Sequence, residues 1–138
     1  MDGVVINYWA VLVAAVVHMA VGFLWYGPVF GKVWMGYMGF TQESMKGMKL
    51  NPTQAMSLGF ITALIMAYVL AGFMDASAMD TLGWKGAFEL TFWLWLGFMV
   101  PHAASAFIWE GKPYGLFILN AANQFVSLFL MGLVFAFW

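Results

Sequence analysis

The chain has 138 residues, of which 64% are hydrophobic and only 8% are charged, a composition that excludes an ordinary water-soluble domain. Five Lys and Arg residues are balanced by six Asp and Glu residues. The chain therefore lacks the basic excess that binds nucleic acid, and we expect no nucleic-acid partner. The absence of cysteine excludes disulfides, thiolate metal sites and a cysteine nucleophile.

Four continuously apolar stretches predict an all-α integral membrane protein, a bundle of four transmembrane helices. A helix needs roughly 20 residues to cross a hydrocarbon layer about 30 Å thick, and each stretch is long enough. The stretches do not alternate with a period of two, as half-buried strands would. We expect helices at 6–30, 53–74, 84–108 and 114–138, all within one transmembrane domain over 1–138.

Capping residues and prolines mark the helix starts. Asn51 can cap the second helix, with Pro52 in its first turn. Asp80 or Thr81 is the candidate cap of the third helix, and Pro113 opens the fourth. A Gly-Pro pair near the end of the first helix should kink or end it, because proline removes a backbone donor.

The lysines predict the orientation, because cytoplasmic loops of membrane proteins are enriched in Lys and Arg. The loops at 31–52 and 109–113 contain Lys32, Lys46, Lys49 and Lys112, whereas Lys85 lies near the opposite side. We therefore expect a multi-pass protein of the cell (inner) membrane, with these two loops in the cytoplasm and both termini outside. The loop at 31–52 also carries aromatic residues and methionines, which is typical of an interfacial segment.

An aromatic motif begins within the last turns of the first helix, where residues 24–35 read Leu-Trp-Tyr-Gly-Pro-Val-Phe-Gly-Lys-Val-Trp-Met. Its distinguishing residues are Trp25, Tyr26, Pro28, Phe30, Gly31 and Trp34. With this motif the chain resembles a prokaryotic membrane family known as domain of unknown function family 1761, whose length and four-span layout it shares. The resemblance implies the four-helix membrane fold and carries over no catalytic residue, substrate or cofactor.

Small residues recur every four positions on the first two helices, and such rows let helix backbones approach closely. The rows consist of Ala10, Ala14 and Gly22 on the first helix and Ala55, Gly59, Ala63, Ala67 and Ala71 on the second. His18 fills the missing position of the first row, so its imidazole should face a neighbouring helix. The rows offer more packing surface than one bundle uses, so we expect oligomerisation.

Four polar residues share one face of the last helix, namely Asn120, Asn123, Gln124 and Ser127. An unpaired amide inside a membrane costs several kcal/mol, so this face needs partners or water. It is either a set of interhelical hydrogen bonds or one wall of a hydrated cavity. With about 1.5 Å of rise per residue, His18 and Gln124 fall near mid-membrane and could meet.

Glu89 is the acid that falls inside a predicted span, about 8 Å from the outer surface. One interpretation is a carboxylate that reaches the headgroups near Lys85. The other is an acid that binds a proton or a cation, for which an acid inside a membrane is a candidate. Its candidate partners are Asn7, Tyr8 and Thr91.

His102 follows Pro101 and could donate to a backbone carbonyl that the proline frees. It differs from His18 in depth by roughly 9 Å, whereas the axial ligands of one haem lie at nearly the same depth. No helix has a His and carboxylate pair at metal-ligand spacing, and no enzyme motif is present. We therefore predict no cofactor, no metal site and no enzymatic activity.

Three functions remain open. We favour a homo-oligomeric transporter or channel-like protein for a small solute or ion. Its candidate polar path consists of His18, Glu89, His102, Asn120, Asn123, Gln124 and Ser127. The first alternative is a non-catalytic structural or accessory subunit of a larger membrane complex. The second is a protein that binds a lipid, quinone or pigment, as Phe92, Trp93, Trp95 and Phe98 would allow. The expected partners are the lipid bilayer and either further copies or a larger complex.

Overall fold

The computed structural model describes residues 3–41, 43–44, 47 and 51–138. Every regular element in these ranges is a helix, which confirms the predicted all-α class. Four spans are long and apolar enough to cross a membrane, and they are Tyr8–Val29, Pro52–Ala76, Met79–Ile108 and Tyr114–Phe137. The chain is therefore a helical membrane protein with four spans.

The first span changes from α-helix to π-helix before it ends. Helix α1 (Tyr8–Leu24) starts after Asn7, whose side-chain oxygen accepts hydrogen bonds from two backbone N–H groups of the first turn. The π-helix η1 (Trp25–Val29) follows and contains the proline of the Gly-Pro pair. Proline has no N–H to donate, and the wider π turn accommodates it.

A short helix, α2 (Gly31–Met38), occupies the start of the segment predicted to be an interfacial loop. It ends at Gly39, whose φ of 70° is the left-handed conformation that favours glycine at a helix C-terminus. Lys46 and Lys49, two of the lysines that predict the orientation, lie outside the described residues.

Helix α4 (Pro52–Ala76) begins as the sequence predicts. The Asn51 side chain accepts from the Gln54 N–H at 2.7 Å, and the Gln54 side chain accepts from the Asn51 N–H at 3.1 Å. This reciprocal pair is a capping box, and Pro52 occupies the first turn. The predicted start of this helix is confirmed.

The third span is built from four short helices in sequence. They are the 3-10 helix η2 (Met79–Leu82), α5 (Gly83–Leu94), the π-helix η3 (Trp95–Met99) and α6 (Val100–Ile108). The expectation that Asp80 or Thr81 caps this span is wrong, because both lie inside η2. The Thr81 hydroxyl donates instead to the Ala78 carbonyl at 2.6 Å.

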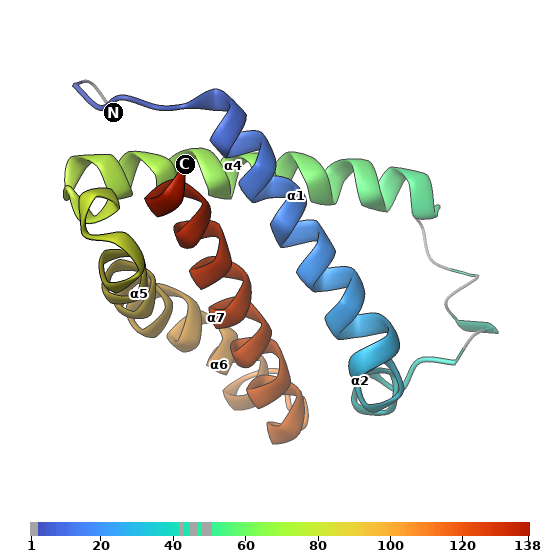
Figure 1. Ribbon diagram of the computed structural model, residues 1–138. Coiled ribbons are helices and arrows are strands. Elements are labelled where there is room, and N and C mark those ends of the chain that lie inside the picture. The colour runs from blue at the N-terminus through green and yellow to red at the C-terminus, as the bar shows by residue number, and fades with distance from the viewer. Residues whose placement is uncertain (1–2, 42, 45–46, 48–50) are drawn as a thin grey trace.

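Helix α7 (Tyr114–Phe137) begins directly after Pro113, as predicted, and lies at the centre of the bundle. Its most extensive contacts are with α1 on one side and α5 on the other (Figure 1). Helix α4 crosses α1, contacts α7 less, and lies across the view rather than alongside the other spans. The start of α1 and the end of α7 lie at the same side of the bundle.

The predicted rows of small residues form much of the core. Five of their members are buried, namely Ala10, Ala14, Ala63, Ala67 and Ala71. Gly59 lies beside Met19, whereas Ala55 is exposed and Gly22 borders open space. The rows are therefore largely used where helices of one chain pack together. Ala55 and Gly22 lie outside these contacts, and the oligomerisation expected from the rows stays a prediction.

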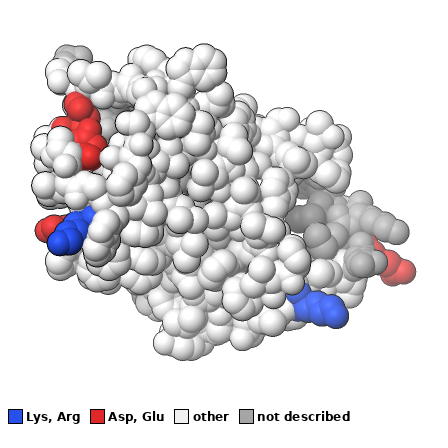
Figure 2. Space-filling model, viewed as in Figure 1, with Lys and Arg blue, Asp and Glu red and all other residues white. Residues whose placement is uncertain are grey.

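The surface is typical of a protein surrounded by lipid. Charged residues lie near the margins of the face seen in Figure 2 and leave a broad uncharged area between them. Large apolar side chains point outward from the spans, including Ile65, Trp93 and Phe98, all more than half exposed. A surface of this kind is stable in hydrocarbon and would aggregate in water.

Candidate functional site

Polar side chains of the first span and α7 meet in one place, which we call the polar seam. It consists of His18, Tyr26, Asn120, Asn123, Gln124 and Ser127. The Nδ1 atom of His18 and the Oγ atom of Ser127 are joined by a hydrogen bond of 2.5 Å. The Tyr26 hydroxyl donates to Asn120 Oδ1 at 2.6 Å. Both bonds link α1 and η1 to α7 inside the bundle.

Two amide oxygens of the polar seam have no hydrogen-bond partner. Asn123 Oδ1 and Gln124 Oε1 are buried, and no donor within the part of the chain that the structure describes reaches either of them. In sequence they lie between Asn120 and Ser127, the α7 residues of the two hydrogen bonds, and Asn123 also lies beside the Tyr26 phenol. Buried polar atoms are nearly always paired, so these two acceptors can bind a donor or a cation.

The structure shows which partner His18 finds. His18 faces α7, as its place in the row of small residues indicates, but its hydrogen bond is to Ser127 and not to Gln124. The sequence marks Tyr26 only as a member of the aromatic motif. One further step of four along the row 10, 14, 18, 22 reaches position 26, and this spacing is the signal that could have identified it.

The aromatic motif fixes the position of Tyr26. The Tyr26 ring packs on Trp34 of α2, with ring centres 5.5 Å apart. Gly31 is buried, and a Cβ atom there would lie 3.0 Å from the Tyr26 carbonyl oxygen. Glycine therefore allows a close approach of α2 to η1 that a larger residue would make tight at this point.

Trp25 and Trp95 form equivalent hydrogen bonds to opposite sides of α7. The Trp25 indole donates to the Leu119 carbonyl at 3.2 Å, and the Trp95 indole donates to the Ala121 carbonyl at 2.8 Å. Each tryptophan is the first residue of a π-helix. The sequence reads Leu-Trp-x-Gly at both 24–27 and 94–97, a repeated signal that could have identified this pair.

Glu89 and His102 do not join the polar seam, and both are exposed. The candidate partners of Glu89 are otherwise engaged. Asn7 caps α1, the Thr91 hydroxyl donates to the Ala87 carbonyl at 2.6 Å, and Tyr8 stacks on Tyr68. In the described ranges no three His, Asp or Glu side chains are grouped so that they could hold a metal ion.

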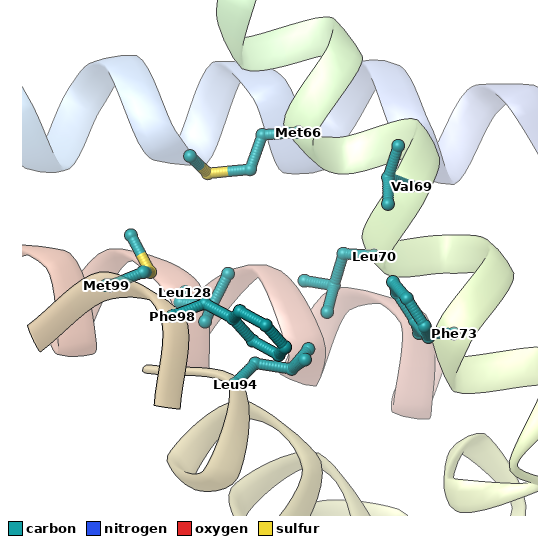
Figure 3. Close-up of a pocket in the computed structure, with 8 residues that line it drawn as sticks. All are labelled: Met66, Val69, Leu70, Phe73, Leu94, Phe98, Met99 and Leu128. Atoms are coloured by element: carbon teal, nitrogen blue, oxygen red, sulfur yellow. The ribbon is translucent and has the colours of Figure 1, made fainter. Parts of the chain in front are cut away.

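A second feature lies between α4 and the third span, and we call it the apolar groove (Figure 3). Helix α4 contributes Met66, Val69, Leu70 and Phe73 to it. The facing wall consists of Leu94, Phe98 and Met99, and Leu128 of α7 forms its base. The groove has a volume of about 360 Å³, and every one of its lining side chains is apolar.

The four aromatic residues predicted to bind a lipid, quinone or pigment do not lie together in the structure. Phe98 lines the apolar groove and is 76% exposed. Phe92 and Trp95 instead pack around Phe125 of α7, with ring centres 6.4 Å and 5.1 Å away. Trp93 is exposed on the outside of the bundle.

Comparison with known proteins gives one match. The sequence model of a family described as "Protein of unknown function (DUF1761)" matches residues 9–136. This range contains the polar seam, the aromatic motif and the apolar groove. Searches of curated proteins and of solved structures found no match.

Proposed function

The chain belongs to this DUF1761 family of proteins of unknown function, and we propose that it is a transporter or channel-like protein for a small solute or ion. The supporting observation is the pair of buried, unpartnered amide oxygens of Asn123 and Gln124 in the polar seam. His18 and Ser127 lie near the midpoints of the spans Tyr8–Val29 and Tyr114–Phe137, and Tyr26 lies three residues before the end of the first span. The polar seam therefore extends from mid-membrane towards one surface.

The unpartnered oxygens favour a path over simple interhelical bonding. If the four polar residues of α7 only joined helices, each amide would be expected to find a partner, because an unpaired polar group in hydrocarbon costs several kcal/mol. Polar residues inside membranes often mark the route of a solute. The free atoms are acceptors, so the proposed solute is one that donates hydrogen bonds or carries positive charge.

The proposed path is completed by a second copy of the chain. Asn120, Asn123 and Gln124 are half-buried as whole residues, although the unpartnered oxygens of Asn123 and Gln124 are themselves buried. Other parts of these side chains therefore lie at the edge of the bundle. A second copy packed over this edge would cover them, and we therefore propose a homo-oligomer. The proposed role is non-enzymatic and requires no cofactor.

Flux into vesicles tests the proposal. The purified protein is reconstituted in liposomes, and uptake of K⁺, Na⁺, ammonium, urea and glycerol is followed. We expect flux of at least one of these probes. Asn123→Leu and Gln124→Leu should each abolish that flux, because they remove the unpartnered acceptors.

The matched control is Ser57→Ala on α4. The Ser57 hydroxyl is exposed and donates to the Thr53 carbonyl of its own helix, so flux should be unchanged. Equal flux through wild type and both leucine variants would contradict the proposed path. A different result would favour an accessory subunit instead. In that case no probe would show flux, and native mass spectrometry would recover the chain only together with larger, different subunits.

A further inference from the structure

The apolar groove is separate from the proposed polar path, because it lies between α4 and the third span whereas the polar seam lies between the first span and α7. We propose that the apolar groove binds one acyl chain of a membrane phospholipid. This site would hold the lipid at a fixed position rather than as part of the freely exchanging bilayer.

The chemistry of the lining selects hydrocarbon. Leucine, valine, methionine and phenylalanine side chains form both walls and the base, so water would find none of the two to four polar partners it needs. A quinone head group or a pigment ring inside the groove would bring polar atoms that are buried without donors, at a cost of several kcal/mol. An acyl chain has no polar atom to satisfy.

The size of the apolar groove excludes a helix as its occupant. A volume of about 360 Å³ lies at the lower end of the range of small-molecule pockets. An α-helix with its side chains is about 10–12 Å across, which is too wide to enter this space. A single flexible hydrocarbon chain can enter, and the methionines at positions 66 and 99 can adjust to its shape.

The apolar groove opens to the surface of the spans. Phe98 is 76% exposed and Val69 is 40% exposed at its edges, so its mouth is on the outside of the bundle. This part of the surface lies between two spans that are apolar enough to cross a membrane. Lipid acyl chains are the molecules that surround such a surface, and they reach the mouth without crossing water.

The fold explains why a space remains here. Helix α4 packs chiefly against α1 and crosses the bundle, so it does not lie along the third span. The third span is widened at the same level by the π turn of η3, which carries Phe98 and Met99. The two walls therefore face each other across a gap that their own side chains do not close (Figure 3).

Photolabelling of the whole chain tests the proposal. The protein is reconstituted in vesicles of phosphatidylethanolamine and phosphatidylglycerol that contain a phosphatidylcholine with a diazirine on its acyl chain. After irradiation, the adducts are mapped by mass spectrometry. We expect adducts concentrated at 66–73 and 94–99, and one phospholipid retained per chain in native mass spectra. Adducts spread evenly over all exposed apolar positions would overturn the proposal, as would a retained molecule that is not a phospholipid.

Two tryptophan variants of α4 make the test specific. Val69→Trp places a large ring in the apolar groove, so labelling at 94–99 and the retained phospholipid should both be lost. Ile65→Trp is the control, because Ile65 is 60% exposed one turn earlier and does not line the groove. Its labelling should match wild type. Wild-type labelling in Val69→Trp would contradict the proposal. Since both variants leave the polar seam intact, the flux experiment can succeed or fail independently.

Discussion

At the scale of single residues, the bond between His18 and Ser127 determines how the middle of α1 meets the middle of α7. Ser127 is fully buried and His18 is half-buried, so neither side chain can turn to water. A hydrogen bond between transmembrane helices contributes about 0.6 kcal/mol on average, with a maximum of roughly 1.7 kcal/mol.

We predict that Ser127→Ala lowers the free energy of unfolding by about 1 kcal/mol, because it leaves the His18 ring without its partner. The measurement is reversible unfolding in mixed micelles, combined with His18→Ala in a double-mutant cycle. The coupling energy should be favourable. Ser57→Ala, which removes a hydroxyl bonded within its own helix, should have almost no effect. Strictly additive effects of the two seam substitutions would contradict the assigned bond.

The sequence predicts that His18 faces a helix but not which residue it meets. The first inference needs only the four-residue spacing within one helix. The identity of the partner depends on how far α7 is shifted along its axis relative to α1. One helical turn rises about 5.4 Å, and Gln124 and Ser127 are separated by less than one turn. Side-chain packing between helices determines such a shift, and no pattern within one segment records it. For the same reason the unpaired state of Asn123 Oδ1 could not be predicted.

At the scale of helices, α5 and α7 approach each other at two small residues. Ala87 is fully buried on α5, and Gly132 lies opposite it on α7. A Cβ atom at Gly132 would lie 2.9 Å from Thr91 Cγ2 and 3.4 Å from the Ala87 Cβ. The Thr91 hydroxyl is bonded to its own helix, so this side chain has little freedom to move away.

We predict that Gly132→Ala destabilises the protein by about 1–3 kcal/mol, the usual cost of overpacking. The matched control is Gly22→Ala on α1, where an added Cβ meets nothing within 4 Å. Alanine favours a helix over glycine by about 1 kcal/mol, so the control should be neutral or stabilising. Unfolding of both variants under the same conditions gives the comparison. The close approach would be refuted by equal stability of Gly132→Ala and wild type.

These two glycines also show where a sequence pattern is informative. The rows on the first two helices repeat every four residues and predict a packing surface that the core largely confirms. Gly22 continues its row, yet an added Cβ atom there would meet nothing within 4 Å. Gly83, Ala87 and Thr91 also recur every four residues on the third span, and this spacing is the signal that could have identified the close contact between α5 and α7.

At the scale of the whole molecule, the composition predicts a membrane protein, and the four long apolar runs predict the number of spans. Long apolar runs are required of any helix that crosses a bilayer, and each run can be recognised from the sequence of its own segment. The crossing angle of α4 and the presence of the apolar groove cannot be recognised from any single segment. Lipid gives helices no hydrophobic reason to associate, so the arrangement depends on the fit between side chains of different spans.

The orientation predicted from the lysines can be tested with single cysteines, because the chain has no cysteine of its own. We predict that Ser77→Cys, in the turn after α4, reacts with a membrane-impermeant maleimide added to intact spheroplasts. Glu110→Cys, in the turn before α7, should react only after the membrane is permeabilised. Both positions are exposed, so a difference reports the side of the membrane. The opposite order of labelling would reverse the orientation and place both termini in the cytoplasm.

The two indole hydrogen bonds on α7 have a mechanical consequence. Leu119 and Ala121 are two residues apart, and their carbonyls are bonded from opposite neighbours, η1 and η3. Any rotation of α7 about its axis would have to break both bonds at once, so the two tryptophans together hold α7 against rotation. The first span, α7 and the third span are therefore joined into one unit by side-chain hydrogen bonds. Neither indole bond reaches α4, so the position of α4 depends on its packing against α1 instead.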